Sequence, residues 1–140
     1  MKIRFKQLKE GGQKPLKKNE GDAGYDICSC ENHLIEPMSR RLIGTGISLQ
    51  IPEGFYAHVS DRSGLALNSG AHCLGKIIDS TYRGEIGVII YNTDMYTPIK
   101  IKSGQRIAQI IIKKYEKVEF EEEELELSER GEKGFGSSGE

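Results

Sequence analysis

The sequence predicts an all-β domain, and three observations support this fold class. Apolar runs are short, turn residues separate them at close intervals, and no segment keeps the 3.6-residue apolar period of an amphipathic helix. The 17 glycines also suit an architecture with many tight turns. About ten short strands with frequent turns are typical of a closed or sandwiched β domain.

The expected strands follow one another from residue 2 to residue 120. Each is rich in β-branched and aromatic residues and is bounded by glycine, proline or polar residues, a composition that favours strands. They cover residues 2–8, 25–30, 33–37, 40–52, 54–62, 72–79, 86–92, 98–104 and 106–120. Between two of them, residues 64–70 (GLALNSG) are expected to form a single helical turn.

Three segments are predicted to form hairpins, because turn residues stand between two apolar arms. Residues 46–59 turn at the sequence PEG, and residues 98–110 turn at the sequence SG. Residues 75–90 (GKIIDSTYRGEIGVII) turn at DSTYRGE, where Gly84 is expected to take a positive φ. In this segment Asp79 directly follows two isoleucines. Aspartates commonly begin turns, but a carboxylate at the edge of a core is also a candidate for chemistry.

Charge and hydropathy argue against several classes of function. The 20 basic and 21 acidic residues give a net charge of −1, so the chain has no overall attraction to nucleic acid. The lysines of residues 2–18 alternate with Ile3 and Phe5, which favours a solvated edge strand over a nucleic-acid surface. The longest apolar run, IAQIII, is too short to span a membrane, and we expect no signal peptide.

The three cysteines indicate a reducing, intracellular setting such as the cytoplasm or nucleus, because an odd number without a secretion signal does not suit a disulfide framework. The stretch CSCENH offers Cys28, Cys30 and His33 as metal ligands. We favour two thiols on one strand face instead, since Cys-x-Cys has the strand period and no second ligand pair follows.

The last segment, residues 121–140, differs from the rest. It begins with an acidic run and ends in GFGSSG, and it cannot form a core of its own. Taken alone, its composition favours a flexible linker. Closely spaced glycines and serines, with Arg130 and Phe135, also offer the donors of a phosphate cradle and a surface for stacking.

Five polar clusters interrupt the pattern: DAGYDICS (22–29), DRSGLA (61–66), GKIIDSTYRGEIG (75–87), GQRIAQ (104–109) and RGEKGFGSSG (130–139). Each alone is weak, because turn aspartates and exposed arginines are common. Together and in this order they resemble the five motifs of the trimeric dUTPases (deoxyuridine triphosphate nucleotidohydrolases). The resemblance implies a jelly-roll-like β-barrel over residues 1–120. It also implies a homotrimer, whose C-terminal arm (residues 121–140) closes the active site of a neighbouring subunit.

The resemblance also implies the reaction, which is magnesium-dependent hydrolysis of dUTP to dUMP and pyrophosphate. Asp79 matches the carboxylate that activates the attacking water, and Tyr82 matches the aromatic residue that packs on the deoxyribose and excludes a 2′-hydroxyl. Asp26 matches the acidic residue that reaches Mg²⁺ through water. Backbone groups of residues 76–79 and of Gly87 match those that recognise uracil. The implied substrate-binding residues are Arg62, Ser63, Gly64, Lys76, Ile77, Ile78, Tyr82, Gly87, Gln109, Arg130, Phe135, Gly136, Ser137 and Ser138.

The chain departs from the family pattern at several positions. Asp61 stands where the family usually has proline, and Lys76 stands where it usually has glycine. The segment NSGAHCLG (68–75) differs in detail, and smaller departures are Ser138 for threonine and Lys133 for glycine. Two alternatives stay open. One, which Asp61 and Lys76 keep open, is a nucleotide-binding or regulatory protein on the same fold with weakened catalysis. The other, which we favour less, is an enzyme related to the dCTP deaminases, whose fold is shared.

Overall fold

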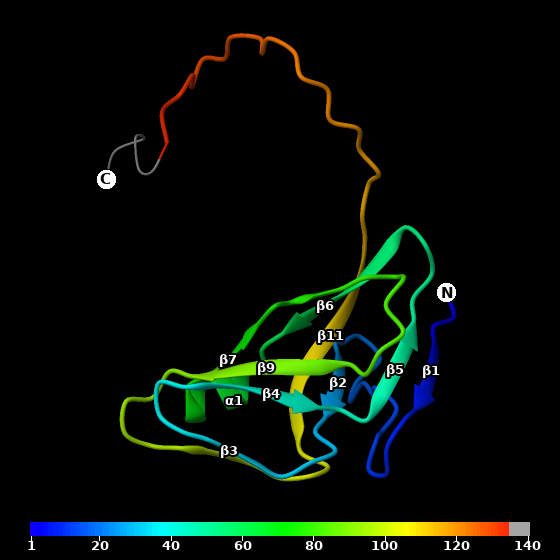
Figure 1. The fold of residues 1–140 in the computed structure, drawn as a ribbon, viewed down its shortest axis with the longest axis vertical. Helices are drawn as coiled ribbons and strands as arrows, with labels where there is room; N and C mark the ends of the chain where they lie inside the picture. The colour runs from blue at the N-terminus through cyan, green and yellow to red at the C-terminus, as the bar shows by residue number, and fades with distance from the viewer. Residues whose placement is uncertain (135–140) are drawn as a thin grey trace.

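A computed structural model describes residues 1–134 and shows an all-β body with one short helix and an extended C-terminal arm (Figure 1). Its elements are β1 (Arg4–Gln7), β2 (Tyr25–Cys28), β3 (His33–Ile35), β4 (Arg40–Gly44), β5 (Ile47–Gln50), β6 (Phe55–Ser60), α1 (Ser63–Ser69), β7 (Ala71–Leu74), β8 (Ile77–Ile78), β9 (Gly87–Asn92), β10 (Ile99–Ile101) and β11 (Arg106–Lys114). The all-β prediction is confirmed.

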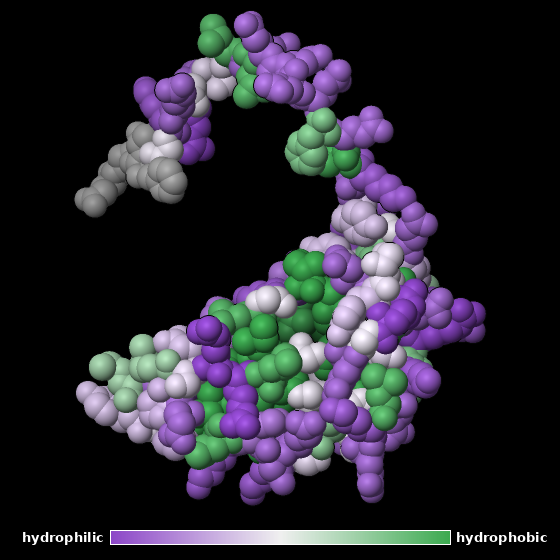
Figure 2. All heavy atoms as spheres, viewed as in Figure 1, coloured by the Kyte–Doolittle hydropathy of each residue, from purple (hydrophilic) through white to green (hydrophobic). Residues whose placement is uncertain are grey.

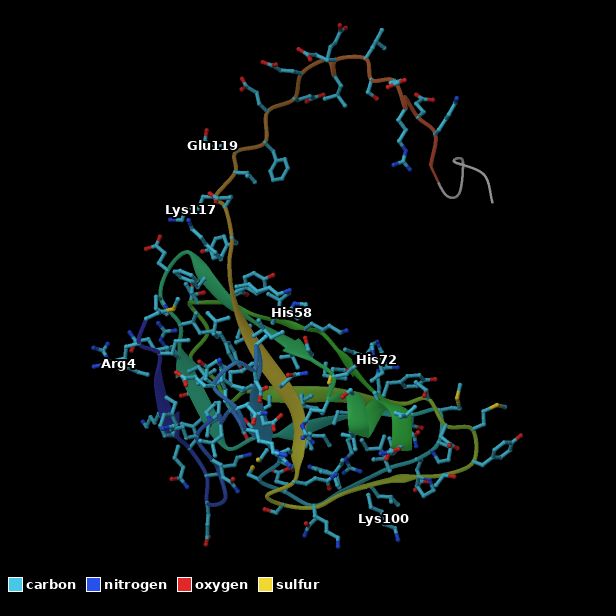
Figure 3. The ribbon with its side chains drawn as sticks, turned by 180° about the vertical axis from the view of Figure 1, so that it is seen from behind. Arg4, His58, His72, Lys100, Lys117 and Glu119 are labelled. Atoms are coloured by element: carbon cyan, nitrogen blue, oxygen red, sulfur yellow. The ribbon has the colours of Figure 1, made fainter. Side chains whose placement is uncertain are left out.

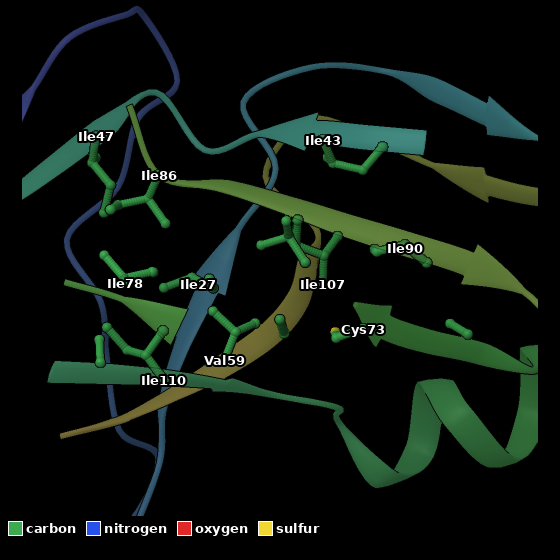
Figure 4. Close-up of a cluster of buried hydrophobic side chains, with 14 of the residues drawn as sticks. Ile27, Ile43, Ile47, Val59, Cys73, Ile78, Ile86, Ile90, Ile107 and Ile110 are labelled. Atoms are coloured by element: carbon green, nitrogen blue, oxygen red, sulfur yellow. The ribbon is translucent and has the colours of Figure 1, made fainter. Parts of the chain in front are cut away.

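The strands form four small antiparallel sheets. Their orders are β2-β11-β6-β8, β4-β9-β7, β1-β5 and β10-β3. The two larger sheets cover the two sides of one core. Figure 4 shows Ile27, Val59 and Ile110 pointing from the four-stranded sheet toward Ile43 and Ile90 of the three-stranded sheet. This arrangement of packed sheets is compatible with the jelly-roll-like fold that the sequence predicts.

Isoleucine dominates the core. Ile27, Ile35, Ile43, Ile47 and Ile90 are each at most 1% exposed. Burial of one such side chain contributes about 1.5–3 kcal/mol relative to leaving it in water. The β-branched side chain also favours the strand conformation itself, so the same residues support both the local structure and the packing.

The predicted turns are present, but two of them join different sheets and not the two strands of a hairpin. β5 pairs with β1, whereas β6 pairs with β11 and β8. β10 pairs with β3, whereas β11 pairs with β2 and β6. The turn glycines Gly54 and Gly104 have φ of +83° and +82°, a conformation that favours glycine. Both turns are therefore corners at which the chain crosses from one sheet to another.

Three long predicted strands are shorter or divided. Residues 40–52 break at Gly46, where φ is +69°, and residues 72–79 break at Gly75, where φ is +60°. Each glycine turns the chain so that β5 and β8 join new partner strands. The last strand ends at Lys114 and does not continue to Phe120. The predicted helical turn is confirmed as α1, which ends at Gly70 with φ 66° and a bond from its N–H to the carbonyl of Ala66.

The arm leaves the body next to the β5–β6 turn, where Lys117 forms an ion pair with Glu53. In residues 115–134 the structure describes no helix or strand, and the arm arches away from the sheets (Figures 1 and 2). The apolar side chains of Phe120, Leu125 and Leu127 are 92% to 102% exposed. Within the described chain, no helix has the length and apolar character that crossing a membrane requires.

Candidate active site

Three of the five motifs meet around the carboxylate of Asp26, on β2. Arg62 donates from Nε to Asp26 Oδ1 at 2.8 Å, and Arg106 donates from Nη1 to Asp26 Oδ2 at 3.0 Å. The Asp26 side chain is 19% exposed, and the two arginine side chains are more exposed at 28% and 50%. Arg62 also donates from Nη1 to the carbonyl of Arg106 at 3.4 Å. The carboxylate therefore fixes two guanidinium groups side by side, and their remaining N–H groups can bind an external anion.

Beside these arginines lies a hollow of about 480 Å³. Arg62, Gly64 and the start of α1 line one side, and residues 104–106 line the other. Gly64 has open space where a Cβ would stand, so its main chain is accessible from the hollow. Two cations next to an accessible glycine-containing turn form a surface suited to phosphate groups. The structure thus brings together the predicted residues Arg62, Ser63, Gly64 and Asp26, together with Arg106.

Gln109 lies behind this hollow, on β11 opposite Asp26. Its Nε2 donates to the carbonyl of Asp61 at 2.8 Å, so it holds the chain that leads into Arg62. Its amide group lies against Gly24, where a Cβ would come within 2.0 Å of Oε1. A residue with a Cβ at position 24 would therefore force the Gln109 side chain to move.

The carboxylate of Asp61 points away from Arg62 and toward β7. Oδ2 lies 2.7 Å from His72 Nδ1, and Oδ1 accepts the backbone N–H of Cys73 at 2.6 Å. Burial by itself would raise the pKa of Asp61, but the hydrogen bonds from Cys73 and His72 outweigh it and lower the pKa. Burial and the nearby Asp61 charge raise the pKa of the Cys73 thiol to about 12, so this cysteine stays protonated.

The segment that carries Asp79 is a hairpin at its base and open at its tip. β7 pairs with β9 through residues 71–74 and 89–92, so the chain returns antiparallel, but the first paired arm ends before the predicted hairpin of residues 75–90 begins. Beyond Gly75 the first arm leaves β9 and pairs with β6 as β8. The predicted pairing of residues 75–78 with the returning strand is wrong, because the positive φ of Gly75 redirects the chain. The two arms therefore separate at the tip.

The separated arms leave main-chain groups on their edges. Lys76 accepts a hydrogen bond from Val59 N–H at 2.8 Å, so antiparallel alternation directs the amide and carbonyl of Ile77 away from β6. On β9, Asn92 donates to Ser39 next to β4, and the same alternation directs the groups of Gly87 away from β4. Ile77 and Gly87, both predicted to recognise uracil through the backbone, thus keep outward-facing N–H and C=O groups.

The turn after β8 has a defined shape and an exposed carboxylate. The carbonyl of Asp79 accepts the N–H of Tyr82 at 3.1 Å, and the Tyr82 hydroxyl donates to the carbonyl of Glu85 at 3.0 Å. The Asp79 side chain is exposed at the beginning of this turn. The predicted positive φ of Gly84 is wrong. A Cβ at position 84 would stand 2.4 Å from the Tyr82 hydroxyl, so a larger residue there would displace the Tyr82 ring.

Asp79 and the arginine cluster lie far apart in one protomer. Ile78 pairs with Ala57, which places Asp79 beside Tyr56 near the start of β6. Arg62 follows the end of β6 with an extended backbone, six residues beyond Tyr56, or about 20 Å at the rise of a strand. The sheet order β2-β11-β6-β8 adds three strand spacings, about 14 Å, between Asp26 and the strand that leads to Asp79.

A second cluster of possible metal ligands is better explained as an ion-pair group. Cys30, Glu31 and Glu85 each offer an atom within 4.8 Å of the others. The ammonium of Lys9 lies 2.8 Å from Glu85 and 3.2 Å from Glu31. The hydrogen bonds that Lys9 donates to Glu85 and Glu31 raise its pKa, so it stays charged. The carboxylates of this cluster are therefore already paired with a cation. The disfavoured metal set of Cys28, Cys30 and His33 is not brought together within residues 1–134.

The arm residues are only partly within the described chain. Arg130 is exposed on the arm and donates from Nε to the carbonyl of Lys133 at 2.8 Å. The predicted residues Phe135, Gly136, Ser137 and Ser138 lie outside the described residues. Two contacts are not predicted from the sequence: that of Arg106 with Asp26, and that of Asp61 with His72. Arg106 and Asp61 are visible as charged residues within motifs, but their partners are distant in the sequence.

Comparison with known proteins agrees with these motifs. A family model described as dUTPase matches residues 11–139. The deoxyuridine 5′-triphosphate nucleotidohydrolase of Corynebacterium diphtheriae is 46% identical, over 89% of this chain and 84% of that protein. The corresponding protein of Paramecium bursaria Chlorella virus 1 is 44% identical, over 96% of this chain and 95% of that protein.

Solved structures give the same result. The dUTPase of Staphylococcus bacteriophage 80alpha with dUPNHPP superposes with a TM-score of 0.89 at 31% identity, and it covers 99% of this chain and 98% of its own. A mutant dUTPase from phage phi11 of S. aureus, which coordinates a structural Mg(II) ion, superposes with a TM-score of 0.84 at 25% identity and covers 89% and 98%.

Proposed function

The chain belongs to the dUTPase family and hydrolyses dUTP to dUMP and pyrophosphate, and we propose that Asp79 activates the attacking water while the Arg62 loop holds the phosphates. The observation that supports the phosphate assignment is the pair of guanidinium groups fixed by Asp26 beside an open hollow. The water would attack the α-phosphorus in line and lose a proton toward Asp79 as pyrophosphate leaves.

We propose that the working enzyme is a homotrimer in which one active site takes residues from different subunits. The separation of Asp79 from the arginine cluster, about 20 Å along β6, carries this proposal. The α- and γ-phosphorus atoms of one nucleotide are much closer together than that. An aspartate and an arginine loop that act on the same triphosphate must therefore come from two copies of the chain, and a closed ring of copies repeats the site symmetrically.

The open hairpin tip supports selection of uracil and deoxyribose. The outward-facing backbone groups of Ile77 and Gly87 offer both donors and acceptors to the edge of a pyrimidine. Tyr82 is fixed by its bond to Glu85 and presents a rigid aromatic surface at the same turn, where a sugar would pack. A site that matches one donor pattern rejects a base with another pattern, because buried polar groups then stay unpaired. The carbonyl of Lys76 is bound by Val59 on β6, so Lys76 would hold the position of Ile77 and would not offer that carbonyl to the base.

Magnesium dependence is also a proposal. Each oxygen of Asp26 already accepts one hydrogen bond from an arginine and keeps a further lone pair. This donor set fits contact with a hydrated cation through water better than direct ligation between two guanidinium groups. When bound to the triphosphate, Mg²⁺ would supply charge neutralisation, and Asp26 would orient its hydration shell.

The arm is proposed to cover the site of a neighbouring subunit. Residues 1–120 would act as the barrel domain, and residues 121–140 as the acidic linker and closing arm. The near-complete exposure of Phe120, Leu125 and Leu127 supports this division, since three large apolar side chains on an extended segment favour docking on another surface. Arg130, Gly136, Ser137 and Ser138 would then reach the γ-phosphate, and Phe135 would stack on the uracil. The free state of Cys28, Cys30 and Cys73 supports a reducing, intracellular compartment.

A substrate panel tests the proposed function. The protein is incubated with dUTP, dTTP, dCTP and UTP, with Mg²⁺ and with EDTA, while pyrophosphate and ammonia are measured. We expect pyrophosphate from dUTP alone, and only with the metal. Ammonia from dCTP would instead support a deaminase, and dUTP binding without turnover would support a regulatory protein. Asp79→Asn should remove hydrolysis but retain nucleotide binding, and normal turnover by this variant would contradict the catalytic assignment.

A further inference from the structure

We propose that Asp61 and His72 form a positioning pair that anchors the phosphate-binding loop on β7 and thereby sets the affinity for the triphosphate. This inference rests on the proposed role of the Arg62 loop. It assigns a function to a residue that departs from the family pattern and to a histidine outside the five motifs. Neither side chain contacts the proposed reacting atoms, so the pair acts through Arg62.

Asp61 is attached to one strand of each of the two larger sheets by three short contacts. Its carboxylate contacts His72 Nδ1 at 2.7 Å and the Cys73 N–H at 2.6 Å, both on β7. Its carbonyl accepts from Gln109 Nε2 on β11 at 2.8 Å. Figure 3 shows His72 on the strand beside α1, at the end of the body that carries the phosphate-binding loop. Residue 61 is therefore clamped between two strands directly before Arg62.

Strand β7, to which Asp61 is bonded, is anchored in the core. Ala71 and Cys73 of β7 are 6% and 2% exposed, and Cys73 packs in the core (Figure 4). A loop bonded to the backbone of a buried residue can move only if that strand moves with it. His72 itself is nearly half exposed, so its ring lies at the surface and reaches the carboxylate from outside. The pair thus holds the loop before Arg62 at a fixed position relative to β7.

The orientation of the Asp61 carboxylate also keeps its negative charge directed away from the phosphate-binding hollow. A charge on Asp61 facing the phosphates would repel them, whereas the observed orientation directs it to His72 and a backbone amide. Arg62 is held from the other side by Asp26 at 2.8 Å. The bonds of Asp61 to His72 and Cys73 thus fix the backbone directly before Arg62. Removing them would leave Arg62 with more orientations and weaken ground-state binding of dUTP.

The test is a double-mutant cycle on the full chain with dUTP and Mg²⁺. We expect Asp61→Ala to raise KM about 10-fold and His72→Ala about 3-fold, because a hydrogen bond to a charged group is worth about a tenfold change in affinity. The turnover number kcat should stay within about 2-fold of the wild-type value, because the variants weaken the binding of substrate and transition state equally. The double variant should resemble Asp61→Ala, because the two residues act as one unit. His72→Asn, which keeps an N–H donor, should recover most of the affinity.

The chain offers a matched control in the pair of Glu31 and His33, whose atoms lie 2.8 Å apart on the β3 side of the body. Glu31→Ala and His33→Ala should leave KM unchanged. Asp61→Asn keeps an acceptor for Cys73 and serves if Asp61→Ala does not fold. Unchanged KM in Asp61 and His72 variants, additive effects, or a loss confined to kcat would overturn the inference. Arg62→Ala in the same series separates the two levels. If Arg62→Ala does not weaken dUTP binding, the phosphate-loop assignment is wrong. If Arg62→Ala weakens binding but the Asp61 and His72 variants do not, the positioning pair is wrong.

Discussion

Two variants that are each inactive should regain activity when their subunits are mixed. Asp79→Asn removes the proposed base, whose contribution to rate is about 10²–10⁴-fold. Arg62→Ala removes a proposed phosphate contact and breaks the pairing with Asp26, and it should lower kcat/KM about 100-fold. Because Asp79 and Arg62 lie about 20 Å apart along β6, a site that uses both must take them from different subunits.

The size of the recovery follows from the geometry of a ring of three. In a mixed trimer of either composition, one of the three interfaces joins an intact Asp79 to an intact Arg62. At equal amounts of the two variants, random assembly makes about three quarters of the trimers mixed, so about a quarter of all sites are intact. We therefore expect about 25% of the wild-type rate per site after co-refolding or co-expression.

The assay follows pyrophosphate release from dUTP by the purified mixture, with each variant alone as the baseline and the mass of the assembly measured in parallel. A mixture of Asp79→Asn with Asp79→Glu is the control, because it alters the same position in every subunit and should show no such recovery. Mixed trimers that form but stay at baseline would refute the assignment of one site to two subunits.

Three further predictions follow. Truncation after Leu127 should leave an assembled, folded protein with kcat/KM lowered about 100-fold, because the described strands end at Lys114; it is checked by circular dichroism and turnover, and full activity would remove the arm from the mechanism. Gly75→Ala should lower the free energy of unfolding by about 1–2 kcal/mol in urea melts, because φ of Gly75 is +60°, and it should also raise KM for dUTP. The control Gly54→Ala, at φ +83° with open space around the Cβ position, should lower stability alone. Equal effects of the two variants on KM would contradict the role of Gly75 in opening the hairpin tip. The pKa of Asp61 is lowered in the folded state, so its contribution to stability is complete above the ordinary pKa of 3.8 and is lost as pH falls through the lower folded-state pKa. Asp61→Asn should therefore make the free energy of unfolding depend less on pH in this acid range. An unchanged pH dependence in an acid-unfolding series would show that the contacts to His72 and Cys73 do not contribute to stability.

Most of the strands and turns of this protein follow from its local sequence. The β-branched runs from Tyr25 to Lys114 form strands because a side chain that suits a half-buried pleated surface favours that conformation wherever the chain places it. Gly54 and Gly104 stand at turns because only glycine adopts their φ without strain. The order of five motifs identified the family, and with it the reaction, since each motif is a short segment whose residue types are visible without the fold.

The tertiary structure alone decided which strands pair and which side chains meet. A turn such as the one at Gly54 looks the same in the sequence whether it closes a hairpin or crosses to another sheet, because the choice depends on partner strands many residues away. The same holds for Asp61. Its charge was visible beside Arg62, but its direction is set by His72 and by the backbone of Cys73, eleven and twelve residues further along the chain. The separation of Asp79 from Arg62 is likewise a product of strand register, so only the assembled sheet shows that one protomer holds these two residues far apart.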